Sequence, residues 1–123
     1  MSWLFVALGG SIGALLRYGC YKFLGSYSQY FGTFFVNFTG SFLIGALAFF
    51  LSRYIDEHLR LFLIIGFLGA FTTFSSFSLE AFGMIEKGEY VKMLLYVISM
   101  NIGSILCAFI GVYFAKFFIK LFL

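Results

Sequence analysis

Charge is scarce in this 123-residue sequence, because only 11% of its residues are Asp, Glu, Lys or Arg. Ordinary globular domains carry about 25% charged residues, which supply much of their water-facing surface. Hydrophobic residues instead reach 63%, and the mean hydropathy is +1.05. Eight basic and five acidic side chains cannot cover a soluble protein of this size, so we infer that lipid solvates the chain. The net charge of +3 predicts no nucleic-acid partner, because basic residues on so apolar a chain flank membrane spans.

Proline is absent, histidine occurs once and cysteine twice, whereas glycine occurs fourteen times. Many glycines without proline favour helices that pack closely in a membrane. Cys20 and Cys107 both lie in apolar runs, so a disulfide framework is not expected, and their redox state stays open. His58 has no cysteine or second histidine at metal-ligand spacing. With no Ser/His/Asp arrangement and no phosphate-binding glycine loop either, the sequence predicts a protein that is not an enzyme.

Four apolar runs are long enough to cross a membrane, which takes about 20 mainly apolar residues. They are residues 3–21, 31–52, 61–79 and 93–115. An amphipathic tail follows the fourth run, and the connectors are short. The sequence therefore predicts an all-α membrane protein, with four transmembrane helices in a single domain over residues 1–123.

The basic residues divide evenly between the two sides of the predicted membrane. The side that holds both termini carries Arg53, Arg60, Lys116 and Lys120, and the other side carries Arg17, Lys22, Lys87 and Lys92. The positive-inside rule acts on a difference between the sides, and here there is none. Two interpretations stay open. Either something other than these charges fixes the orientation, or the chain inserts both ways round and pairs as an antiparallel homodimer.

Two polar side chains lie within the first two spans, where such groups are costly unless they are paired or line a watery path. Arg17 follows a GxxxG face formed by Gly9 and Gly13, and lies near the end of its span. It either snorkels to the headgroups or attracts anions into a vestibule. Asn37 lies about one and a half helical turns into the second span. It either forms an interhelical hydrogen bond or offers two N–H donors to a passing ion.

The third span contains the most informative pattern, Gly-Phe-Leu-Gly-Ala-Phe-Thr-Thr-Phe-Ser-Ser-Phe-Ser-Leu-Glu over residues 66–80. Two glycines followed by a β-branched pair make a poor helix. A break is therefore expected near Ala70, the middle of the span, and would free carbonyls that can coordinate a cation. Phe74 and Phe77 lie on one helix face among hydroxyl side chains. This stripe is either simple packing or a pore lining.

Hydroxyls, amides and the electropositive edges of phenyl rings would make a pore lining without full charges. Cation channels use rings of acidic side chains or carbonyl filters. The side chains present here favour instead a small, strongly hydrated anion that must bind and then leave.

Three motifs, taken together and in order, resemble those of the Fluc fluoride-channel family, also called CrcB. They are Gly-Gly-x-x-Gly-Ala-x-x-Arg (9–17), Gly-Thr-x-x-Val-Asn-x-x-Gly (32–40) and Gly-x-x-Gly-x-x-Thr-Thr-Phe-Ser-x-Phe-Ser-x-Glu (66–80). The third is highly specific, and the resemblance covers nearly the whole chain. It implies an antiparallel, dual-topology homodimer of four-helix subunits, with two fluoride pores and one structural sodium ion at the subunit interface.

The resemblance also implies a role for each matching residue. Asn37 would be the pore asparagine, and Phe74 and Phe77 would turn their ring edges toward fluoride. Further pore positions carry hydroxyls, namely Ser75, Ser76, Tyr96 and Ser104.

Four other residues match positions outside this pore lining. The backbone carbonyls of Gly69 and Thr72 would bind the sodium ion, and Arg17 and Glu80 are candidates for a vestibule or gating role. Met100 stands where some relatives carry a hydroxyl, so the contribution of the fourth helix stays open.

The function implied is passive fluoride export across a plasma membrane of the bacterial type, which relieves fluoride toxicity. Two other classes of protein are alternatives. A small dual-topology multidrug-type transporter needs a carboxylate in its first span, and residues 3–21 contain none. A structural membrane subunit would tolerate scattered polar residues, whereas here they gather on the second and third spans.

Overall fold

The computed structural model describes residues 1–54 and 56–123, and in these residues all regular structure is helical. Helices α1 (Ser2–Leu24), α2 (Phe31–Tyr54) and α6 (Tyr90–Phe122) form three of the spans. Shorter pieces between Glu57 and Glu86 form the other. The prediction of four membrane-spanning helices is confirmed, since all four are long and apolar enough to cross a membrane.

Each predicted span is shorter than the observed one, most of all the third, which covers Glu57–Glu86 instead of 61–79, and the fourth. The fourth span begins three residues before the predicted Met93 and continues to Phe122, so the expected separate tail is part of α6. Lys116 and Lys120 are one turn apart on this helix. Long basic side chains can extend their charged ends to water from positions inside a membrane-spanning helix. A basic residue therefore does not mark the end of α6.

The third span consists of four helical pieces. A short helix, α3 (Glu57–Arg60), continues into the π-helix η1 (Leu61–Leu68) and then into α4 (Gly69–Phe71). The chain is not helical over residues 72–74, and helix α5 (Ser75–Glu86) follows. Thr72 has extended backbone, with φ −79° and ψ 160°. The interruption therefore begins two residues after Ala70, while both glycines of the motif lie in helical pieces.

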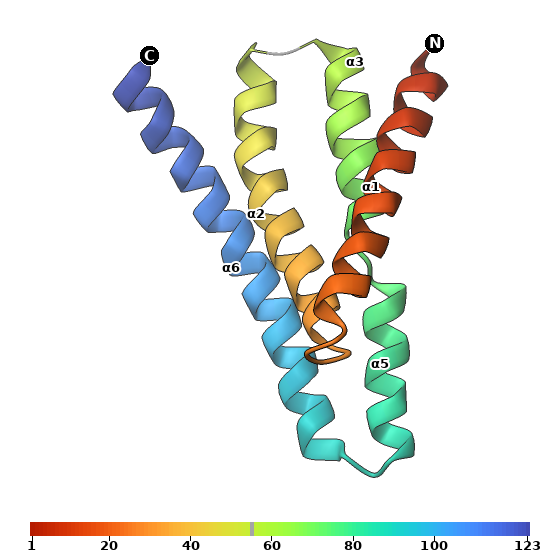
Figure 1. Cartoon of the computed structure of the whole chain (residues 1–123). Coiled ribbons are helices and arrows are strands. Elements are labelled where there is room, and N and C mark those ends of the chain that lie inside the picture. The colour runs from red at the N-terminus through yellow and green to blue at the C-terminus, as the bar shows by residue number, and fades with distance from the viewer. Residues whose placement is uncertain (55) are drawn as a thin grey trace.

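The helices pack as two pairs that meet beside the interruption (Figure 1). Helix α2 packs along α6, whereas α1 packs on η1 and α4. Helix α5 lies against α6, and the α5–α6 connection is at the opposite end of the molecule from both termini. Both termini and the α2–α3 connection share one end, as the sequence predicts.

Glycines line the tightest helix contacts. A Cβ atom on Gly9 or Gly13 of α1 would run into the backbone carbonyl of Phe62 or Phe67. The GxxxG face therefore brings α1 against the backbone of the third span. Gly45 and Gly111 do the same between α2 and α6, where each faces a backbone carbonyl of the other helix. Backbones approach this closely only where a side chain is missing.

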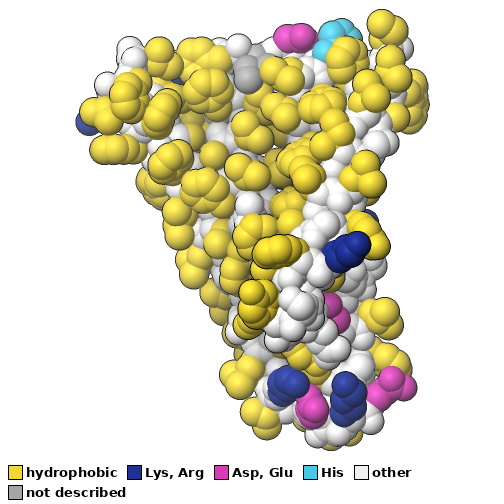
Figure 2. Space-filling model, in the orientation of Figure 1, with side chains coloured by type: hydrophobic (Ala, Val, Ile, Leu, Met, Phe, Trp, Pro, Cys, Tyr) yellow, Lys and Arg dark blue, Asp and Glu magenta, His cyan; other side chains and the backbone are white. Residues whose placement is uncertain are grey.

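The surface is mostly apolar (Figure 2). Hydrophobic side chains cover most of the visible face, and the lower end carries a cluster of charged ones. Trp3 is 88% exposed, and large side chains along the whole of α6 are exposed as well. A small interior cluster of Phe77, Met84, Tyr96 and Met100 joins α5 to α6. This distribution suits a protein whose outer surface is solvated by lipid.

The contact at Gly13 gives a matched test of helix packing. Gly13→Ala should destabilise the protein by about 1–3 kcal/mol, because the new methyl group overpacks against the Phe67 carbonyl. Gly19→Ala, on the same helix, has nothing within 4 Å of its new Cβ and should cost less than about 0.5 kcal/mol. Thermal melting in detergent compares the two variants, which gain the same helix propensity. Equal melting temperatures would contradict the close α1–η1 contact.

Candidate functional site

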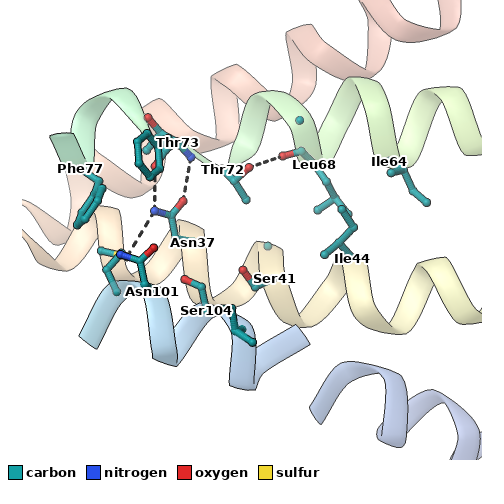
Figure 3. Close-up of a pocket in the computed structure, with 15 residues that line it drawn as sticks. Asn37, Ser41, Ile44, Ile64, Leu68, Thr72, Thr73, Phe77, Asn101 and Ser104 are labelled. Carbon is teal, nitrogen blue, oxygen red and sulfur yellow. Dashed lines mark hydrogen bonds between the residues drawn. The ribbon is translucent and has the colours of Figure 1, made fainter. Parts of the chain in front are cut away.

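A cavity of about 360 Å³ opens beside the interruption, between α2, the third span and α6 (Figure 3). The sequence-predicted residues that line it are Asn37, Gly69, Thr72, Phe74, Phe77 and Ser104. Ser41, Met100 and Asn101 also line it. Residues distant in the sequence therefore meet in one cavity, where a few polar groups lie among mostly apolar side chains.

Asn37 of α2 holds the backbone of Thr73 by two hydrogen bonds. Its Oδ1 accepts from the Thr73 N–H at 2.8 Å, and its Nδ2 donates to the Thr73 carbonyl at 2.9 Å. In a continuous α-helix the Thr73 N–H would instead donate to the carbonyl of Gly69. Asn37 Oδ1 thus accepts the hydrogen bond that the Gly69 carbonyl would accept in a continuous helix.

The hydroxyl of Thr73 also accepts a hydrogen bond that would go to a backbone carbonyl in a continuous helix. Its Oγ1 accepts from the Ser76 N–H at 3.2 Å. In a continuous helix that N–H would donate to the carbonyl of Thr72. The helical donors of the Gly69 and Thr72 carbonyls are therefore both diverted to side-chain acceptors. Backbone carbonyls freed in this way are typical ligands for a cation in broken membrane helices.

The second N–H of Asn37 points at sulfur. Its Nδ2 lies 3.5 Å from Sδ of Met100, which is 4% exposed. A thioether is a weak acceptor. The expectation that Asn37 offers two N–H donors to an ion therefore needs revision, because Thr73 holds one of them firmly. The donor facing Met100 is the more weakly held of the two.

The two phenylalanines have different surroundings. Their ring centroids are 5.4 Å apart with an interplanar angle of 59°. Phe77 is 4% exposed and packs on Tyr96, with centroids 5.3 Å apart, whereas Phe74 is 73% exposed. Both line the cavity. Phe77 belongs to the interior of the subunit, and Phe74 lies on its open side.

A second polar cluster surrounds Glu80, away from the cavity. Oε1 of Glu80 accepts from the Thr33 hydroxyl at 2.8 Å, and Oε2 accepts from the Tyr96 hydroxyl. The Tyr21 hydroxyl lies 2.6 Å from Oγ1 of Thr33. Since the only hydroxyl hydrogen of Thr33 goes to Glu80, Tyr21 must be the donor to Thr33. This directed chain links α1, α2, α5 and α6 through one carboxylate.

The remaining predicted residues lie outside both clusters or at their edge. Ser75 is exposed and Ser76 half-buried at the start of α5, both within hydrogen-bonding distance of the Thr73 hydroxyl. Arg17 is half-buried on α1, away from the cavity lining. In the described part of the chain its guanidinium has neither a hydrogen bond nor an ion pair.

Sequence reasoning missed Thr33, Tyr21 and Ser41. Thr33 is 0% exposed and stands in the second motif, so its position next to Gly32 offered a signal. Tyr21 offered none, because its ring packs against Gly32 and its hydroxyl reaches Thr33 only after folding. Ser41 lies one helical turn after Asn37 on α2, which places it on the same face.

Comparison with known proteins identifies the family. The family model described as CrcB-like protein, Camphor Resistance (CrcB), matches residues 4–112. A Hydrogenobaculum protein named fluoride-specific ion channel FluC is 43% identical over 115 residues, which are 90% of this chain and 94% of the relative. Proteins of the same name are 44% identical over 121 residues in Legionella pneumophila (94% of this chain, 90% of the relative) and 46% identical over 113 residues in Thermus thermophilus (89% of each). The resemblance drawn from the three motifs is confirmed, and the chain belongs to the CrcB family.

Proposed function

We propose that this protein is a fluoride channel that lets fluoride leave the cell passively across the plasma membrane. The observation that carries the proposal is the cavity beside the interruption, whose lining combines amide, hydroxyl and phenyl groups with no carboxylate among the described residues. The protein's relatives that are named fluoride-specific ion channel support fluoride as the ion. A small anion can be held briefly by donors that carry no full positive charge.

The conducting form is an antiparallel homodimer. The cavity opens on a side of the subunit where Phe74 is 73% exposed. Gly69 is exposed there too, and a Cβ on it would meet only the Ile64 carbonyl, at 3.7 Å. Polar groups such as Asn101 on this side would be costly against lipid. A second copy covers them, and the even division of basic residues allows it to insert in the opposite orientation.

Sodium is the structural ion of this dimer. The carbonyls of Gly69 and Thr72 fit it, because their helical donors are diverted to Asn37 and Thr73. Two oxygens from each of two chains make four carbonyl ligands at the interface. The ion would supply a fixed positive charge near the middle of the membrane and would tie the two interruptions together.

The anion path runs along side chains on both sides of the interruption. Asn37 gives the N–H that now faces Met100, and Phe74 and Phe77 give ring edges from the two subunits. Hydroxyls continue the path at Ser75, Ser76, Tyr96 and Ser104. The hydroxyl of Tyr96 donates to Glu80, so an anion must compete with that carboxylate for it. This arrangement makes Glu80 a gating candidate, and Arg17 attracts anions to the vestibule.

Fluoride flux from liposomes tests both the function and the role of the rings. The purified protein should release trapped fluoride but not chloride. Phe74→Ile and Phe77→Ile should each lower the flux by about tenfold or more, or roughly 1.4 kcal/mol, because isoleucine keeps apolar bulk but lacks the electropositive ring edge. Leu79→Ile, at an exposed position of the same helix, is the control and should conduct normally.

The outcomes separate the competing functions. A wild-type protein that releases no fluoride would refute the channel, and proton-coupled uptake of a quaternary ammonium drug would favour the multidrug-type alternative. If the two isoleucine variants conduct like the wild type, the rings only fill space. Apolar swaps of similar volume cost less than about 1.5 kcal/mol, so both variants should still assemble.

Added charge tests the antiparallel dimer. Two or three lysines inserted into the connection between Tyr54 and Glu57 should force a single orientation, and the same addition between Glu86 and Tyr90 should force the opposite one. Neither forced form alone should conduct, and the two expressed together should restore flux. Labelling of a single introduced cysteine from each side of the membrane reports orientation. A forced form that conducts by itself would contradict the antiparallel arrangement.

A further inference from the structure

The ends of α2 and α6 hold a group of basic side chains that the ion path does not use. Arg53 lies in the last turn of α2, with its guanidinium carbon 4.9 Å from the centroid of the Phe49 ring. Nζ of Lys116, on α6, lies 5.5 Å from the same centroid and 5.3 Å from that of Tyr113. One aromatic ring is thus shared by two cations from different helices.

No acidic side chain neutralises these two cations in the described residues. The only ion pair there joins Lys92 to Glu89, at 2.9 Å and near the opposite end of α6. On the face shown in Figure 2, acidic side chains lie at the lower end and near the α2–α3 connection, and none lies over the upper part of α6. Among the described residues, Arg53 and Lys116 therefore have no ion-pair partner.

The two cations also lie near each other, because they share one ring. Since both lie within 5.5 Å of one ring centroid, they are no more than about 10 Å apart, which is about one Debye length at 0.1 M salt. The face of the Phe49 ring attracts each of them, but it supplies no negative charge. An anion bound beside this ring would lie near both cations.

The position of the group identifies the anion. It lies at the ends of two membrane-spanning helices, beside exposed aromatic and aliphatic side chains of α6 such as Phe117 and Leu121. At that depth the anions present in quantity are the phosphates of lipid headgroups, and basic pockets between membrane helices bind such headgroups. We propose that Arg53, Lys116 and the Phe49 ring form a binding site for the headgroup phosphate of an anionic phospholipid, whose acyl chains lie along α6.

The opposite end of α6 provides a matched control. Lys92 also lies over an aromatic ring, with Nζ 5.0 Å from the centroid of Tyr30. Its ion pair with Glu89 already satisfies its charge. Both ends of α6 therefore have a cation over an aromatic ring. The Arg53–Lys116 site differs because no carboxylate forms an ion pair with its cations among the described residues.

Native mass spectrometry of protein taken from vesicles of phosphatidylcholine and phosphatidylglycerol (3:1) tests the proposal. Wild type should retain phosphatidylglycerol in preference to phosphatidylcholine. The double variant Arg53→Gln/Lys116→Gln should lose retained phosphatidylglycerol by roughly tenfold or more, as expected for two basic residues beside an anionic lipid. Lys92→Gln should retain it like wild type, and so should the charge-conserving Arg53→Lys/Lys116→Arg.

Three outcomes would overturn the proposal. The first is equal retention by the wild type and the glutamine double variant. The second is loss of lipid from the charge-conserving variant, which would make the site a matter of side-chain shape rather than charge. The third is displacement of phosphatidylglycerol by millimolar inorganic phosphate, which would identify a site for the free anion. Helix content by circular dichroism shows that each variant is folded before its lipids are counted.

Discussion

The side-chain amide of Asn37 accepts the hydrogen bond that Thr73 would donate to the Gly69 carbonyl in a continuous helix. The geometry around the cavity depends on this change of partner. Two hydrogen bonds, of 2.8 and 2.9 Å, tie Thr73 to α2 instead of to its own helix. A buried backbone group left without a partner would cost about 1–3 kcal/mol, so these bonds from α2 stabilise the interruption within lipid. A second consequence follows, because the carbonyl of Gly69 is left for another partner.

Two polar groupings beside the interruption have different properties. The cavity holds neutral groups on its open side, where Phe74 is exposed and Met100 offers only a weak acceptor to Asn37. In the Glu80 cluster, hydroxyls of Thr33 and Tyr96 donate to the carboxylate from two helices. The acid is thereby held apart from the neutral lining. Such a separation suits the passage of an anion, which a carboxylate in the cavity would repel.

The sequence predicts what depends on local composition. Apolar run length predicts the four spans, and the cost of a polar group within a span draws attention to Asn37. It could not predict that Asn37 binds Thr73, or that Tyr21 reaches Thr33, since these contacts join segments whose relative placement arises only on folding. The predicted end of the fourth span was also wrong, because it was placed before Lys116, whereas α6 continues past that residue.

The most direct test of the account follows the carbonyl carbons of Gly69 and Thr72 by solid-state NMR in bilayers as sodium replaces potassium. We expect both ¹³C shifts to respond, while that of Phe74, whose oxygen already accepts from Ser78, stays constant. The response of Gly69 should persist in Asn101→Leu and disappear in Asn37→Leu, because Asn37 diverts the donor of Gly69. Carbonyl shifts insensitive to sodium in the wild type, or equally sensitive in Asn37→Leu, would contradict the account.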